Sequence, residues 1–173
     1  MLVIAIDSAV EALGLVKPHA AKTIAEMMTF DLVEHPCLTT TRYRKEGEQL
    51  TKEEKKALSL RSNAFLSRAA YDDLTEAGLM RPLEAHELVM LRAYFIMARY
   101  RTVRNTAKEM AEVSAWKGDF KYDILNKECP VCWSLEGQHT KANDAYIMPP
   151  PGCVCETANY GFGVCVDWLA DIE

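Results

Sequence analysis

Apolar residues recur at helical spacing over most of the chain and alternate with polar residues only near the C-terminus. The spacing predicts two helices within residues 1–35, with a break near Gly14 and Pro18. Alternation predicts a strand over residues 120–125 and a second short strand over residues 164–168. The pattern is therefore typical of a mainly α protein with a small α+β module at its C-terminal end.

Two long helices joined by a short link are predicted in the middle of the chain. The first begins at Thr51, where Thr-Lys-Glu-Glu forms a capping box, and extends to about Ala77. Gly78 and Pro82 end it, and the second helix covers residues 83–114. Because a short link favours antiparallel neighbours, we expect these two helices to form an antiparallel helical hairpin or bundle.

The apolar stripe of the second helix predicts how this hairpin packs. Leu88, Leu91 and Phe95 lie on one helical face and are expected to be buried against the first helix. The facing apolar residues of the first helix are Leu58, Phe65 and Leu66.

Length and composition indicate a folded protein of one domain, or of one domain with a small appendage. Of the 173 residues, 49% are apolar, which is enough for a core and argues against disorder. We expect a helical domain at residues 1–116 and a Cys-rich module, a candidate for zinc binding, at residues 117–173. The net charge of −5 gives no general electrostatic attraction to nucleic acid.

The N-terminal residues do not match a secretory signal, because no basic segment precedes the apolar ones and Asp7 follows at once. The longest apolar run, residues 88–98, contains Arg92 and is too short to span a bilayer. We therefore expect no membrane partner and a reducing compartment, in which clustered cysteines favour a metal over disulfides. The isolated Cys37 is expected to be a small buried apolar residue.

Two close pairs of cysteines carry the main chemical signal. Cys129 and Cys132 form a CxxC pair, and Cys153 and Cys155 form a CxC pair about twenty residues later. Two such pairs supply four thiolates, the ligand set of a tetrahedral zinc site. A site with four protein ligands leaves no open position for a substrate, so the zinc would be structural.

Other readings of these cysteines stay open. Cys165 or His139 is a substitute ligand for one of the four. Reduced structural thiols and disulfides are alternatives to a metal site. A thioredoxin-like redox pair is disfavoured, because the CxxC sequence does not follow a clear βαβ start.

The most basic part of the second long helix offers a candidate nucleic-acid contact. Arg101, Arg104 and Lys108 share a helical face at spacings of three and four residues. Such a face can contact phosphate groups of DNA. The alternative is an ordinary solvated helix surface, which agrees better with the acidic net charge.

No catalytic motif is found, so we do not expect an enzyme. The sequence has no glycine-rich phosphate loop, no GxSxG nucleophile motif and no HExxH zinc motif. An HNH-type nuclease needs a metal-binding Asp-His pair near the cysteines, and none lies near Cys132.

The C-terminal motifs occur in a specific order. Arg101-Thr102 lies on the predicted helix, and residues 121–125 lie on the predicted strand. The turn Cys-Pro-Val-Cys-Trp-Ser-Leu-Glu-Gly follows at residues 129–137, and Pro-Pro-Pro-Gly-Cys-Val-Cys follows at residues 149–155. This order resembles the phage minor head proteins of the head-morphogenesis (Mu F-like) family, which combine an Arg-Thr helix, a strand, a CPxCxxLxG turn and a CxC pair. The resemblance covers roughly residues 90–157.

The resemblance implies a structural role rather than catalysis. It suggests a virion or head-assembly component, found in the virion or the host cytoplasm, that contacts portal or capsid proteins and packaged DNA. The alternative function is an intracellular zinc-knuckle module that binds nucleic acid or a regulatory protein partner.

Overall fold

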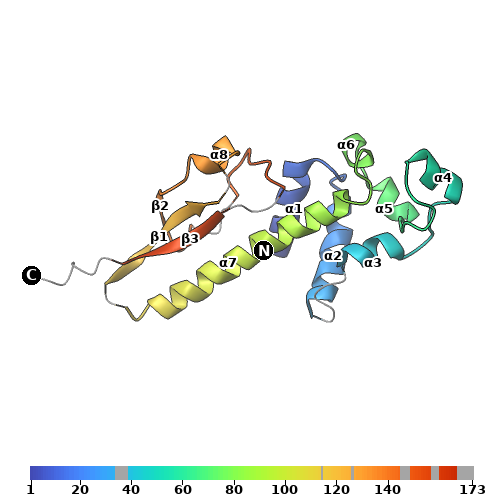
Figure 1. Cartoon of the computed structure of the whole chain (residues 1–173). Helices are drawn as coiled ribbons and strands as arrows, with labels where there is room; N and C mark the ends of the chain where they lie inside the picture. The colour runs from blue at the N-terminus through green and yellow to red at the C-terminus, as the bar shows by residue number, and fades with distance from the viewer. Residues whose placement is uncertain (34–38, 114, 126, 145–148, 157–159, 167–173) are drawn as a thin grey trace, which may run out of the picture. The chain divides into compact units, whose positions relative to one another are not determined.

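Helices build the N-terminal part of the chain, and a three-stranded antiparallel sheet lies in the C-terminal part (Figure 1). The structure is a computed structural model that describes all residues except 34–38, 114, 126, 145–148, 157–159 and 167–173. Contacts divide it into two compact units, residues 1–94 and 95–173. This grouping does not test where an independently folding domain ends, so the boundary at residues 116 and 117 stays a prediction.

The first unit is built from helices joined by loops, with two isolated β-bridges (Val16 with Leu74 and Gln49 with Ser67). Its elements are α1 (Leu2–Leu13), α2 (Ala20–Val33), α3 (Thr39–Lys45), α4 (Lys52–Ala57), α5 (Arg68–Asp72), α6 (Glu76–Leu79) and the first part of α7 (Ala85–Met110). Gly14 ends α1 in the left-handed region, with a φ of 60°, and its N–H donates to the carbonyl of Val10. The predicted break near Gly14 and Pro18 is therefore confirmed. No helix in the described ranges has the length and apolarity needed to cross a bilayer.

The predicted long helix over residues 51–77 is wrong. The capping box at its start is present, since Thr51 and Glu54 bond reciprocally through side chain and backbone. The helix α4 nevertheless ends at Ala57, and Ser59 takes a positive φ of 57°. A non-glycine residue in that region ends a right-handed helix.

Two further N-caps explain why the chain starts new helices in this region. Ser67 accepts a hydrogen bond from the N–H of Ala70 and begins α5. Thr75 accepts one from the N–H of Gly78 and begins α6. Serine and threonine stabilise helix starts more than helix interiors, so both residues compete against one continuous helix.

The antiparallel helical hairpin is therefore not formed by the described residues. In the first unit α7 buries the stripe of Ala85, Val89 and Ala93, all fully shielded from solvent. Leu91 is exposed on another face, and Phe65 is 52% exposed. α7 has apolar residues on several faces, and the face with Ala85, Val89 and Ala93 is the one buried in the core of the first unit.

A buried histidine in this unit makes its stability dependent on pH. The His86 ring is fully buried and meets the Tyr43 ring edge to face, with centroids 4.7 Å apart. The Tyr43 hydroxyl in turn donates to the carboxylate of Asp73. Burial lowers the pKa of His86 to about 4.

We expect the free energy of unfolding to fall as the pH drops from about 6.5 to about 4. In that range the unfolded chain binds a proton at His86 and the folded chain does not, so acid favours unfolding. The shift corresponds to about 3 kcal/mol. Denaturant unfolding at several pH values would measure it, with His86→Leu as the reference that lacks this proton. Equal pH profiles for the two proteins would contradict the prediction.

The second unit combines the end of α7 with the sheet. Its other elements are β1 (Trp116–Ile124), α8 (Pro130–Trp133), β2 (His139–Lys141) and β3 (Tyr160–Val166), with strand order β2-β1-β3. The predicted helix over residues 83–114 and the predicted strand over residues 120–125 correspond to α7 and β1. β3 overlaps the second predicted strand, whose last two residues lie outside the described part. The sequence did not predict β2, which has only three residues.

The face of the sheet formed by alternate residues of β1 is buried. Phe120, Tyr122 and Ile124 all point to this side, as the period of two requires. Phe120 and Val103 of α7 form one small core, and Figure 1 shows the end of α7 running along the sheet. Phe95 packs beside Tyr122 in a second core that contains cysteines.

Candidate metal centre

The first cysteine pair lies at the start of the short helix α8. Cys129 is its N-cap residue and Pro130 occupies the first helical position, where the fixed φ of proline suits a helix. The N–H of Trp133 donates to the carbonyl of Cys129 at 2.8 Å. This single helical turn brings the side chains of Cys129 and Cys132 to the same side.

The second pair follows the proline-rich segment. The N–H of Cys153 donates to the carbonyl of Pro150 at 3.1 Å and closes a turn, in which Gly152 takes a φ of +84° that disfavours other residues. Cys153 is buried, whereas Val154 is 67% exposed. Residues two apart in extended chain point to the same side, so Cys153 and Cys155 both face inward.

The fold brings these four residues together, and we call them the cysteine cluster: Cys129, Cys132, Cys153 and Cys155. All four Sγ atoms lie within 4.8 Å of one another. Cys132 Sγ lies 3.1 Å from Cys153 Sγ and 4.0 Å from Cys155 Sγ. A tetrahedral site with Zn–S bonds of about 2.3 Å has sulfur–sulfur edges of about 3.8 Å. The cluster can therefore hold one metal ion with small side-chain shifts.

The protonation of the cluster is divided unevenly among its thiols. Burial raises the pKa of Cys129, but hydrogen bonds from the Cys132 backbone and from neighbouring thiols outweigh it and lower this pKa to about 7. Burial raises the pKa of Cys155 to about 11 and raises that of Cys132 further. Metal binding therefore has to displace the protons that Cys132 and Cys155 hold.

The sheet holds the cluster from one side. Tyr122, Ile124 and Tyr160 pack against the cysteines in the same buried group. The carboxylate of Glu136, just after α8, accepts from the N–H of Ile124 at 2.6 Å. The N–H of Gly137 donates to the carbonyl of Tyr122 at 3.1 Å. These bonds fasten the segment that carries the first cysteine pair to β1.

The two substitute ligands lie elsewhere. His139 is exposed at the start of β2, and Cys165 is half-buried on β3. Neither belongs to the group of potential ligands found among the described residues. Cys37 lies outside the described residues.

The predicted basic face is solvent-exposed on α7 in the second unit. Arg101, Arg104 and Lys108 are all exposed, and the Arg104 guanidinium donates to the Tyr100 hydroxyl at 3.2 Å. Arg104 and Lys108 also line a hollow of about 240 Å³ together with Asn143. Sequence reasoning missed Asn143, because it comes from the turn after β2, which carried no signal of its own.

Comparison with known proteins gives no relative from which a role could be transferred. No family model, no curated protein and no solved structure matches the chain.

Proposed function

We propose that this protein is a non-enzymatic structural protein, a phage minor head or head-assembly component, in which a zinc ion bound by the cysteine cluster fixes a docking surface. The observation that carries the proposal is the convergence of four thiols within 4.8 Å. The order of motifs that resembles the Mu F-like family supports the head-assembly role, and with it a place in the virion or the host cytoplasm.

Zinc is the metal that this donor set favours. An all-sulfur tetrahedral site selects zinc or an iron–sulfur cluster, and a CxxC pair with a second close pair is typical of structural zinc. The three buried cysteines and the half-buried Cys155 surround the position of a single ion. When bound, zinc would supply folding free energy to the surrounding chain.

The residues beside the ligands form the proposed docking surface. Val154 lies between Cys153 and Cys155, and Trp133 directly follows Cys132. Both side chains are exposed apolar groups, and the Lys127 ammonium lies 5.0 Å from the Trp133 ring. A metal bound between the two cysteine pairs would hold Val154 and Trp133 at a constant separation. A surface with an aromatic anchor and a cation at its edge suits a protein partner such as portal or capsid protein.

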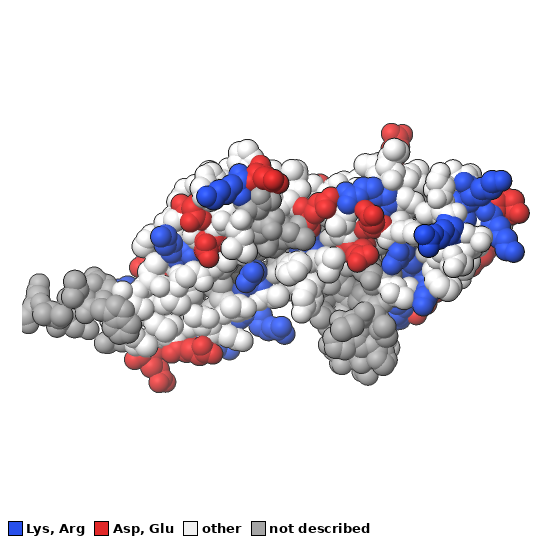
Figure 2. Space-filling model, in the orientation of Figure 1, with Lys and Arg blue, Asp and Glu red and all other residues white. Residues whose placement is uncertain are grey.

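One observation favours the alternative, a zinc knuckle that binds nucleic acid. The 240 Å³ hollow beside Arg104, Lys108 and Asn143 offers two cations and an amide, donors that suit a phosphate group. The net charge of −5 opposes this alternative. Figure 2 likewise shows Lys and Arg interspersed with Asp and Glu over the visible face.

Assembly into particles distinguishes the two functions. Reversal of the basic face (Arg101→Glu, Arg104→Glu, Lys108→Glu) is expected to leave incorporation into particles nearly unchanged, whereas Cys129→Ser is expected to abolish it. Incorporation is measured by immunoblot of purified particles and by copurification with portal or capsid protein.

The matched control reverses three exposed charges in the first unit (Lys52→Glu, Lys56→Glu, Arg61→Glu), which changes the net charge equally. Loss of incorporation only in the basic-face variant, with Cys129→Ser tolerated, would favour the nucleic-acid function. A chain that copurifies with neither portal nor capsid protein would refute the head-assembly role.

A further inference from the structure

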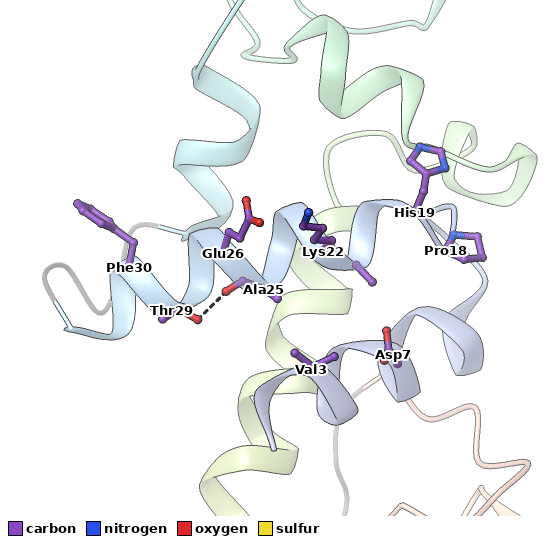
Figure 3. Close-up of a pocket in the computed structure, with 10 residues that line it drawn as sticks. Val3, Asp7, Pro18, His19, Lys22, Ala25, Glu26, Thr29 and Phe30 are labelled. Carbon is purple, nitrogen blue, oxygen red and sulfur yellow. Dashed lines mark hydrogen bonds between the residues drawn. The ribbon is translucent and has the colours of Figure 1, made fainter.

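The first unit has a large hollow between α1 and α2, about 830 Å³ in volume, which we call the α1–α2 groove. Figure 3 shows Val3 and Asp7 of α1 facing it from one side, with Lys22, Ala25 and Glu26 of α2 on the other. The groove belongs entirely to the first unit and contains none of the cysteine cluster.

Apolar side chains at the groove are partly exposed to water. Val3 is 59% exposed. Phe30, which lines the groove near the end of α2, is 47% exposed, with the Arg42 guanidinium 4.3 Å from its ring centroid. Ile4, the next residue on α1, is exposed as well. Covering apolar surface is favourable by about 25 cal/mol per Å², so a partner seated on this face gains binding free energy.

Charges of both signs surround this apolar surface. Asp7, Lys22 and Glu26 line the groove, and none of them forms an ion pair or hydrogen bond with another described residue. A strongly acidic partner would meet Asp7 and Glu26, and a strongly basic one would meet Lys22. A partner that carries both signs can pair with groove charges of either sign.

We propose that the α1–α2 groove is the interface between two copies of this chain, related by a twofold axis. Such an interface presents the same face on both copies, so every contact occurs twice. The apolar residues Val3 and Phe30 of each copy are covered by the other copy. Asp7 of each copy lies against Lys22 of its partner, which pairs two of the three groove charges that lack partners within one chain.

Two charge variants test this arrangement in the full-length protein. Asp7→Lys places two lysines against each other across the twofold axis, and Lys22→Asp places two aspartates there. Each variant alone is expected to dimerise about tenfold more weakly or worse than the native protein, because two ion pairs become two repulsions. An equimolar mixture of the two variants restores opposite charges and is expected to form a heterodimer.

Sedimentation equilibrium measures the dimer constants, and native mass spectrometry with one tagged copy identifies the heterodimer. Lys52→Asp on α4 is the matched control, since it changes the net charge as Lys22→Asp does and should not alter dimerisation. Val3→Asp, which places a charge on the apolar surface, is expected to yield monomers with unchanged circular dichroism.

Several results would overturn the proposal. A native protein that is monomeric at high micromolar concentration has no such dimer. A mixture of the charge variants without heterodimers would show that Asp7 and Lys22 do not meet across copies. Capture of a different protein by Val3 and Phe30, with no dimer of this chain, would show that the groove has another occupant. The test is independent of the metal centre, because Cys129→Ser should still dimerise even if it fails to enter particles.

Discussion

Cys132→Ser is expected to release the bound metal and to unfold the segment around the cysteine cluster, while the first unit stays folded. Cys132 is buried, and its Sγ lies 3.1 Å from that of Cys153, so its loss removes a central ligand. Structural zinc contributes on the order of 10 kcal/mol of apparent free energy in isolated zinc modules. The expected loss is therefore comparable with the whole stability of a small domain.

Elemental analysis of protein purified without added zinc, combined with thiol counting before and after denaturation, measures metal content and cysteine state together. Hydrogen exchange then shows which segments open: β1 and β3 are expected to lose protection, and α1 and α2 are not. Cys165→Ser is the matched control, because it makes the same chemical change at a cysteine outside the cluster. A native protein that holds no metal and yet keeps an ordered sheet under reducing conditions would contradict the prediction.

Phe120→Ala is expected to lower the free energy of unfolding of the second unit by about 3–5 kcal/mol. Phe120 is almost fully buried in the middle of β1 and packs with Val103 of α7. Its ring also meets the rings of Trp116 and Phe162 edge to face, at centroid distances of 5.6 and 6.3 Å. Removing it leaves a cavity that this small core cannot refill.

Chemical denaturation of metal-loaded protein, followed by tryptophan fluorescence, measures this loss. Phe65→Ala is the matched control, since the same atoms are removed from a side chain that is 52% exposed, and a change under about 1 kcal/mol is expected there. Equal effects of the two substitutions would mean that β1 does not pack on α7 as the structure shows.

Local chemistry explains the parts of the structure that were predictable. The break between α1 and α2 was visible because Gly14 and Pro18 act on the backbone directly. β1 was visible because one face of the strand is buried and the other is not, which forces alternation. The proximity of Cys129 and Cys132 was predictable because a CxxC sequence needs only one helical turn to bring its two thiols together.

The amino-acid sequence by itself determined these local features and the chemical types of the candidate ligands. Only the tertiary structure decided which of several local options was used. Ser67 and Thr75 are acceptable in a long helix or at the starts of two short ones, and the packing around them selected the short ones. α7 offers more than one apolar stripe, and contacts distant in sequence decided that Ala85, Val89 and Ala93 face the core.

The cysteine cluster depends both on local sequence features and on the tertiary structure. Each pair is a local feature, but about twenty residues separate Cys132 from Cys153, and the position of one relative to the other depends on β1 and on the bonds of Glu136 and Gly137 to it. The α1–α2 groove had no sequence signal at all, because Val3 and Lys22 lie on different helices and become neighbours only when these pack. A spacing rule describes one segment, whereas a site made from two segments needs the free energy of the whole core to hold them together.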